Sequence, residues 1–229
     1  RASIRGFAYM VDEELEERQR EFVQLIRESV ERLYNTPDAL LDLAKFRAGM
    51  VELDYSTVDL VDEVDSVLQI FKPRAREKGL ALDLAADEPS IQADLDTFCL
   101  ERIMTNLIGN AIKFTEEGGV TVSVRQMEDE VEIRVADTGI GIEEDFLPNI
   151  FEAFRQESSG LSRSHQGVGL GLAITKRMVD LMAGEIEVQS RKGEGTEFIL
   201  TFLRSQAQES ASTNGVVDAM LSREAEPSA

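Results

Sequence analysis

The hydrophobic pattern changes its period near residue 115, and this change restricts the folds open to the chain. Up to that point the apolar residues recur at helical spacing, at Leu100, Ile103, Met104, Leu107, Ile108 and Ala111. Directly afterwards they alternate with polar residues, at Val120, Val122, Val124, Val131, Ile133 and Val135. Alternation of this kind is typical of a β-hairpin with one buried face. The sequence therefore predicts an amphipathic helix over 96–114, followed by a hairpin against which it packs.

Further elements of the same two kinds flank this unit. The pattern predicts a helix over 60–77 and a strand over 80–84. It also predicts a helix over 170–182 and strands over 185–189 and 196–203, separated by the turn-forming stretch RKGEG. Helices packed on one face of a mixed or antiparallel sheet form an α+β fold, a two-layer α/β sandwich.

The two ends of the chain differ from this central region. Near the N-terminus, Val23, Ile26, Val30, Leu33 and Leu40 have the spacing of a coiled-coil or helix-bundle seam. Periodicity alone leaves open a solvated helical hairpin and a dimerising bundle. Because proline disrupts a helix interior, Pro37 predicts a kink or break over 35–38. From Ser205 onward the chain is polar, and we expect it to be disordered.

Charge and cysteine content narrow the class of protein. The 44 acidic and 24 basic residues give a formal charge of −20, which argues against a nucleic-acid or anionic-membrane surface. The single cysteine, Cys99, excludes an intramolecular disulfide, suits a reducing compartment and is predicted to be a core thiol. No apolar run approaches the ~20 residues of a membrane span. We expect a cytoplasmic location without membrane contact, although a parent protein could be membrane-anchored.

Asp137 is the first residue that could carry chemistry. By alternation it lies on the same side of its strand as Val131, Ile133 and Val135, so its carboxylate points toward the buried face. The following Thr138-Gly139-Ile140-Gly141 permits a tight turn and a close approach to a ligand. The carboxylate could accept a hydrogen bond from an exocyclic amine such as that of adenine. In isolation, an ordinary turn-capping aspartate is the commoner alternative.

Three polar residues lie at one edge of the 96–114 helix. Asn106, Asn110 and Lys113 are spaced i, i+4, i+7, which places them within an arc of about 60° at the margin of the apolar stripe. An asparagine oxygen suits Mg²⁺, which prefers hard oxygen ligands, and a lysine can neutralise phosphate as a point charge. A solvated helix edge is the alternative, and it is the more common one for these residue types.

A run of glycines precedes the last predicted helix. Gly167, Gly169 and Gly171 lead directly into it, so unpaired N–H groups at the helix start could bind an anion. The spacing is that of neither a dinucleotide fold nor a P-loop. A plain flexible turn is therefore the alternative for the glycines alone.

Taken in order, five sequence segments resemble the ATP-binding domain of a bacterial sensor histidine kinase, a member of the GHKL ATPase group. NLIGNAIKF is similar to the N box of that family, DTGIGI to the first glycine box and FEAFRQ to the F box. HQGVGLGLAI and GEGTEF are similar to the second and third glycine boxes. The similarity runs from about Ile4 to Leu203, because the region from Arg20 to Leu53 also resembles the second helix of the dimerisation and phosphotransfer hairpin.

The resemblance implies roles for matching residues. Asp137 would accept from the adenine amino group, Asn110 would ligate Mg²⁺ with support from Asn106, and Lys113 would contact the phosphates of ATP. Residues 155–166, which include the sole histidine His165, would form a mobile lid over the nucleotide. The implied nucleotide-contacting set is Asn110, Lys113, Asp137, Gly139, Gly141, Ile142, Gly167, Gly169, Leu170, Gly171 and Thr196.

The resemblance also implies three regions and an activity. Residues 1–54 would be a partial dimerisation and histidine phosphotransfer hairpin, 55–204 the catalytic ATP-binding domain, and 205–229 a disordered tail. The activity would be transfer of the γ-phosphoryl of Mg-ATP to a histidine in a two-component system. The implied partners are a second copy of the chain, through the complete hairpin, and the receiver domain of a response regulator.

The chain departs from the family pattern in three places. The phosphoaccepting histidine of the family precedes an I-x-G-F motif, which is present here as Ile4-Arg5-Gly6-Phe7. We therefore expect the phosphoacceptor upstream of Arg1, no autophosphorylation of residues 1–229, and no phosphoacceptor role for His165. Pro37 is unexpected in the second hairpin helix, and Gln166-Gly167-Val168 replaces the Gly-Gly-Thr of many relatives.

The sequence leaves two alternative functions open. One is a noncatalytic nucleotide-binding or dimerisation module that regulates another kinase. The other is a GHKL ATPase that hydrolyses ATP to water, against which the helical segment and the F box argue.

Overall fold

A computed structural model describes residues 52–156 and 169–205. Most of the predicted hairpin, including the expected kink near Pro37, lies outside the described residues. Residues 157–168, with His165 and Gly167, and the tail beyond Ser205 also lie outside them. The chain divides into two compact units. The described part of the larger unit is 53–147 with 178–205, and that of the smaller unit is 52, 148–156 and 169–177.

The larger unit contains a five-stranded sheet with the order β2-β4-β5-β7-β6. Its strands are β2 (Ala81–Ala86), β4 (Gly119–Gln126), β5 (Glu130–Asp137), β6 (Glu185–Arg191) and β7 (Gly195–Leu203). β2 pairs parallel to β4, whereas the other neighbours pair antiparallel. Of the two predicted alternatives, a mixed or an antiparallel sheet, the structure has the mixed one. Both predicted strand pairs are confirmed, with small differences in strand ends.

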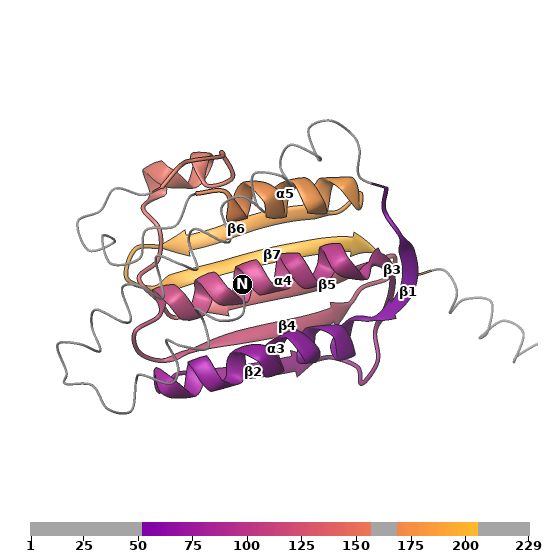
Figure 1. The fold of residues 1–229 in the computed structure, drawn as a ribbon, viewed down its shortest axis with the longest axis horizontal. Coiled ribbons are helices and arrows are strands. Elements are labelled where there is room, and N and C mark those ends of the chain that lie inside the picture. The colour runs from indigo at the N-terminus through magenta and orange to yellow at the C-terminus, as the bar shows by residue number, and fades with distance from the viewer. Residues whose placement is uncertain (1–51, 157–168, 206–229) are drawn as a thin grey trace, which may run out of the picture. The chain divides into compact units, whose positions relative to one another are not determined.

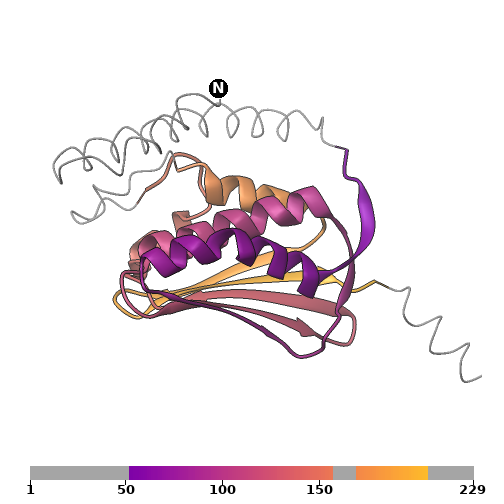
Figure 2. The same cartoon turned by 60° about the horizontal axis from the view of Figure 1, so that its bottom comes forward.

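Helices α3 (Leu60–Glu77) and α4 (Thr97–Phe114) lie side by side on one face of this sheet (Figures 1 and 2). Each begins at an aspartate N-cap, because Asp59 accepts from the Val61 N–H and Asp96 from the Cys99 N–H. The apolar stripe of α4 is buried, as are the alternating residues Val120, Val122, Val124, Val131, Ile133 and Val135. The helical and alternating patterns therefore meet in one core, as predicted.

Two short strands were not predicted. β1 (Tyr55–Asp59) and β3 (Gln92–Asp96) form a separate antiparallel pair. Three of the five β1 residues are exposed, so its sequence gives little alternating signal. β1 leads directly into α3 and β3 into α4, and the pair therefore fixes the starts of the two helices next to each other.

Two helical elements extend across the division between the units. The 3₁₀ helix η1 (Glu144–Asn149) begins in the larger unit and ends in the smaller one. Helix α5 (Gly171–Leu181) begins in the smaller unit and ends in the larger one, close to the predicted bounds of 170–182. Of the helices in the described residues, none combines the length and apolar character needed to span a membrane.

Cys99 and Ser205, for which the sequence pattern makes predictions, are both buried in the larger unit. Cys99 is buried, and burial, followed by the neighbouring Asp96 carboxylate, raises the pKa of its thiol to about 12. The predicted core thiol is therefore confirmed. Ser205, taken from the sequence as the start of the tail, is buried and its N–H donates to the Gln92 carbonyl at 3.5 Å.

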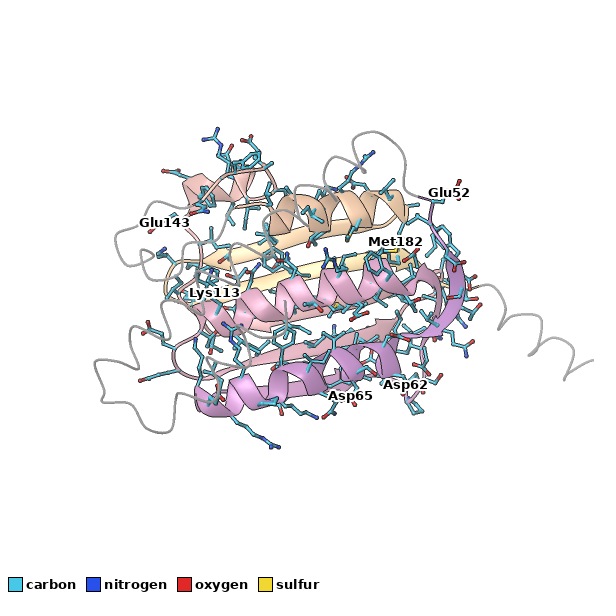
Figure 3. All side chains as sticks on the ribbon, in the orientation of Figure 1. Glu52, Asp62, Asp65, Lys113, Glu143 and Met182 are labelled. Atoms are coloured by element: carbon cyan, nitrogen blue, oxygen red, sulfur yellow. The ribbon has the colours of Figure 1, made fainter. Side chains whose placement is uncertain are left out.

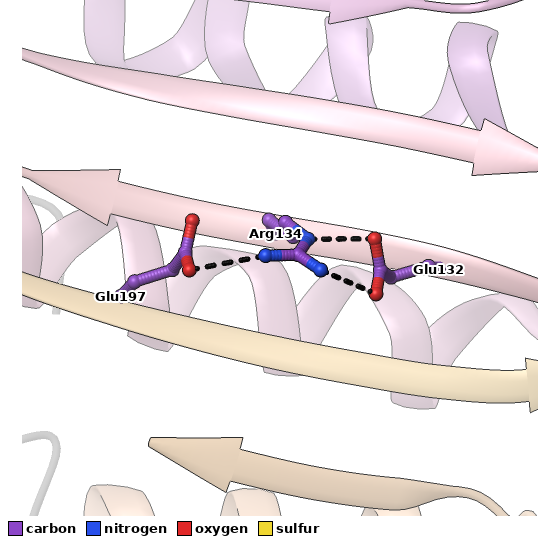
Figure 4. A network of polar contacts seen from close by, with 3 residues as sticks. All are labelled: Glu132, Arg134 and Glu197. Carbon is purple, nitrogen blue, oxygen red and sulfur yellow. Dashed lines mark hydrogen bonds and ion pairs between the residues drawn. The ribbon is translucent and has the colours of Figure 1, made fainter. Parts of the chain in front are cut away.

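The sheet face opposite α3 and α4 carries an ion-pair network (Figure 4). Arg134 donates to both carboxylate oxygens of Glu132, at 2.6 and 2.8 Å, and to Glu197 at 3.2 Å. The hydrogen bonds from Arg134 are the main reason that the pKa of Glu132 lies below its ordinary value. One guanidinium therefore joins β5 to β7 on the side away from the helices.

Candidate nucleotide-binding site

Asp137 is the last residue of β5, the central strand of the sheet, where it pairs with Val120 of β4 and Thr196 of β7. Its Oδ1 accepts from the Gly139 N–H at 2.8 Å and from the Thr196 N–H at 3.3 Å. Among the described residues, both hydrogen bonds to this carboxylate end on Oδ1, which leaves Oδ2 for a ligand. Burial raises the pKa of the carboxyl above its ordinary value, while these two N–H groups act in the opposite direction.

The loop after Asp137 needs glycine for close backbone packing. A Cβ at Gly139 would collide with the Phe114 carbonyl, and one at Gly141, whose φ is 61°, with the Arg191 carbonyl. Gly195, with φ 112°, has no room for a Cβ against the Asp137 carbonyl. These glycines therefore let three backbone segments meet around Asp137.

A serine that the sequence analysis did not select joins these segments. Ser190 accepts from the Ile142 N–H at 2.9 Å and donates to the Gly195 carbonyl at 2.8 Å. Its hydroxyl also lies 2.9 Å from Oγ1 of Thr196. Ser190 is the second-to-last residue of β6, one position beyond the strand predicted over 185–189, and no local motif marks it as a contact of the distant Ile142.

The last turn of α4 lies beside the same loop. The Ile140 N–H donates to the Phe114 carbonyl at 3.2 Å, which brings the loop to the C-terminal end of the helix. Asn106, Asn110 and Lys113 are half-buried, as expected for the margin of an apolar stripe. Figure 3 places Lys113 at this end of α4, and its ammonium lies 4.8 Å from the centre of the Phe114 ring. Lys113, the last of the three polar residues on α4, therefore lies at the end of the helix that contacts the loop following Asp137.

The glycine run belongs to the smaller unit. Gly169 has a φ of 74° and its carbonyl accepts from the Phe154 N–H at 2.8 Å. Leu170 is buried, and α5 begins at Gly171, so these glycines lead into a helix as predicted. Arg155, at the start of the predicted lid, is exposed and pairs with Glu152 at 2.9 Å. The remainder of the lid, with Gly167, lies outside the described residues.

The donor groups fit Mg²⁺ only in combination with a phosphate ligand. The described residues contain no cluster of three histidine, cysteine or acidic side chains that could hold a metal ion by themselves. Within those residues the side-chain amide of Asn110 makes no hydrogen bond, so its oxygen is available. One such oxygen suits Mg²⁺, which usually retains waters and phosphate oxygens as its other ligands.

Residues 96–206 match the family model described as histidine kinase-, DNA gyrase B- and HSP90-like ATPase. The match begins at the N-cap of α4 and ends just after β7, so it includes every site residue considered above. Residues 96–206 therefore form a domain of this ATPase family.

Within that family, the relatives are sensor histidine kinases. The chain is 38% identical over 214 residues to the sensor protein GacS of Pseudomonas syringae pv. syringae, a match that covers 90% of this chain and 24% of GacS. It is 35% identical over 196 residues to the histidine-protein kinase BarA of Escherichia coli K12, covering 81% and 21%. The chain thus spans about a quarter of the length of these relatives.

Solved structures agree with the sequence comparison. Full-length ShkA in complex with AMPPNP superposes with a TM-score of 0.71 at 34% identity, covering 88% of this chain and 42% of ShkA. Histidine kinase ThkA, in complex with the response regulator protein TrrA, superposes with a TM-score of 0.67 at 22% identity, covering 88% and 57%. The likeness to ThkA supports the fold alone.

Proposed function

We propose that residues 55–204 are the catalytic ATP-binding domain of a two-component sensor histidine kinase. In the reaction, the bond from the γ-phosphorus of ATP to the β,γ-bridging oxygen breaks, a phosphorus–nitrogen bond to a histidine forms, and ADP leaves. The observation that carries this proposal is the Asp137 carboxylate, which is partly buried with Oδ2 available, beside the polar end of α4. The relative ShkA, solved with AMPPNP, supports a nucleotide as the ligand.

The adenine end of the nucleotide is assigned to the end of the central strand β5, between β4 and β7. Oδ2 of Asp137 accepts from the exocyclic amine, and the two N–H groups on Oδ1 hold the carboxylate in place. Gly139, Gly141 and Ile142 provide backbone next to the base, with Thr196 on the other side of Asp137. A partly buried acceptor of this kind favours adenine over guanine, whose corresponding position is a carbonyl that cannot donate.

The phosphate end is assigned to α4. Asn110 is the proposed ligand of Mg²⁺, Asn106 supports it one turn earlier, and Lys113 contacts the phosphates. When bound, Mg²⁺ offsets the charge on the phosphate oxygens during transfer. Gly167, Gly169, Leu170 and Gly171 remain proposed phosphate contacts on the sequence resemblance.

The phosphoacceptor and the partners also belong to the proposal. We place the phosphoaccepting histidine upstream of Arg1, because Ile4-Arg5-Gly6-Phe7 matches the motif that follows it in the family. His165, the single histidine of the chain, is then not the acceptor, and residues 1–229 do not autophosphorylate. The proposed partners are a second copy of the chain, joined through the complete hairpin, and a response-regulator receiver domain. The proposed location is cytoplasmic.

Replacement of Asn110 tests this function. Asn110→Ala removes the proposed metal ligand, so transfer of radiolabel from ATP to a supplied histidine-bearing hairpin should fall below detection. Binding of metal-free ADP should persist. Gln126→Ala is the control, because this amide lies at the opposite end of the β4–β5 pair from Asp137. Wild-type transfer by Asn110→Ala, or acid-labile label on His165 of the isolated chain, would contradict the proposal.

A further inference from the structure

Lys78 joins the C-terminal ends of two helices. It is the C-cap residue of α3, and its side chain extends to the end of α4. The ammonium donates to the carbonyls of Ile112 at 2.7 Å, Lys113 at 3.1 Å and Thr115 at 3.0 Å. All three donors of one ammonium group are therefore directed at the last turn of a single helix.

This arrangement suits the chemistry of a helix end. The last four carbonyls of an α-helix have no partner within the helix, and the end carries a partial negative charge. A cation there makes charge-assisted hydrogen bonds, which are stronger than neutral ones. Burial, and then the nearby Arg74, lower the pKa of the Lys78 ammonium, whereas Glu116 acts in the opposite direction. The hydrogen bonds to α4 thus offset the free-energy cost of partly burying the ammonium near Arg74.

The one carbonyl of residues 112–115 that Lys78 does not bind, that of Phe114, binds the loop that follows Asp137. Between Lys113 and Thr115, the Phe114 carbonyl accepts from the Ile140 N–H at 3.2 Å. Residues 112–115 are therefore hydrogen-bonded both to Lys78 and to the loop that follows Asp137. Lys113 itself, with its proposed phosphate contact, lies within the held segment.

Helix packing does not depend on this contact alone. The Phe71 ring of α3 lies over Gly109 of α4, where an added Cβ would be 3.5 Å from the ring. Leu60, Val64, Val67 and Leu68 of α3 are also buried. A variant that lacks the Lys78 ammonium should therefore fold with the two helices still packed.

We propose that Lys78 is a positioning residue for nucleotide binding, which holds the last turn of α4 and the loop 139–141 in the geometry that the ligand needs. This inference rests on the proposed function. It assigns a role in that function to a residue that precedes the family match, which begins at residue 96.

The experiment compares Lys78→Met, Lys78→Arg and the control Lys72→Met. Lys72 lies on the same helix and makes one long ion pair, 3.9 Å from Asp65, whose side chain is labelled in Figure 3. One measurement is amide hydrogen exchange of Ile140 and Thr115 without nucleotide, relative to Val122 and Ile133 in the sheet. The other is the calorimetric Kd for Mg-ATP.

For Lys78→Met we expect exchange at Ile140 to rise about tenfold and the Kd to rise about tenfold, the size of one lost charge-assisted hydrogen bond. The sheet amides and Lys72→Met should match the wild type, and Lys78→Arg should recover part of both effects. Unchanged exchange at Ile140, or a general loss of protection with an unchanged Kd, would overturn the proposal. If the wild type binds no ATP, the proposed function fails, while the exchange data still decide whether Lys78 holds the loop.

Discussion

At the scale of single residues, Ser190 links the backbone segments that surround Asp137, although it lies outside the glycine-containing motifs. Its hydroxyl connects the Ile142 amide to Gly195 and Thr196, and the Thr196 amide in turn donates to Asp137. Removing it should leave a partly buried amide unsatisfied. Ser190→Ala should therefore lower the free energy of unfolding by about 1 to 3 kcal/mol and weaken Mg-ATP severalfold.

Chemical denaturation and calorimetry check the Ser190 prediction. Ser123→Ala is the matched control, since Ser123 lies in β4 between the buried Val122 and Val124 and points to the other face of the sheet. Equal effects of the two substitutions on stability and affinity would show that Ser190 has no special role in the site.

At the scale of elements, an ion-pair network joins β5 to β7 on the face of the sheet away from the helices. Arg134 binds Glu132 of its own strand and Glu197 of β7, and Glu132 is only 8% exposed. Arg134→Met should therefore remove the hydrogen-bond donors of a nearly buried carboxylate, which keeps only the charge attraction of Arg125. The substitution should destabilise the chain by about 1 to 3 kcal/mol at neutral pH. Arg191→Met, which breaks an ion pair with both side chains more than half exposed, should cost less than about 1 kcal/mol.

The same network predicts the pH dependence of stability. The folded-state pKa of Glu132 lies below the ordinary value of 4.5, so its contribution is present above that pH. It is lost as the pH falls through the folded-state pKa, because the carboxyl group is then protonated in the folded chain too. The difference in unfolding free energy between wild type and Arg134→Met should thus shrink below about pH 4.5. A constant difference from pH 7 to 3 would contradict this assignment.

The long periodic elements could be predicted from the sequence, whereas contacts between distant segments could not. Helix α3 has the predicted bounds, and α4 differs only by its N-cap, because an unbroken apolar stripe determines each of them. β1 and β3 were missed because they are short, largely polar, and pair across more than thirty residues. Asp137 was found from alternation, but Ser190 and Lys78 act through partners that only the folded chain brings near.

At the scale of the whole molecule, charge opposes the proposed ligand. A chain with a net charge of −20 repels ATP at long range, so the proposed binding requires local groups such as Lys113 and the hydrogen-bonding geometry at Asp137. In the proposed function, specificity for the base rests on a single carboxylate whose position is fixed by β5, β7 and the loop between Asp137 and Ile142. Adenine recognition by Asp137 is therefore the central claim for the whole chain.

The most direct measurement is a calorimetric titration of Mg-ATP into wild type, Asp137→Asn and Asp129→Asn. Asp129→Asn is the matched control, because it removes the same charge. Asp129 lies in the turn between β4 and β5, at the end of both strands that is opposite to Asp137. We predict that Asp137→Asn weakens binding by about 1.5 to 3 kcal/mol, the range for a hydrogen bond to a charged group, while Asp129→Asn matches the wild type. Wild-type affinity in Asp137→Asn would contradict the assignment of this carboxylate to the adenine base.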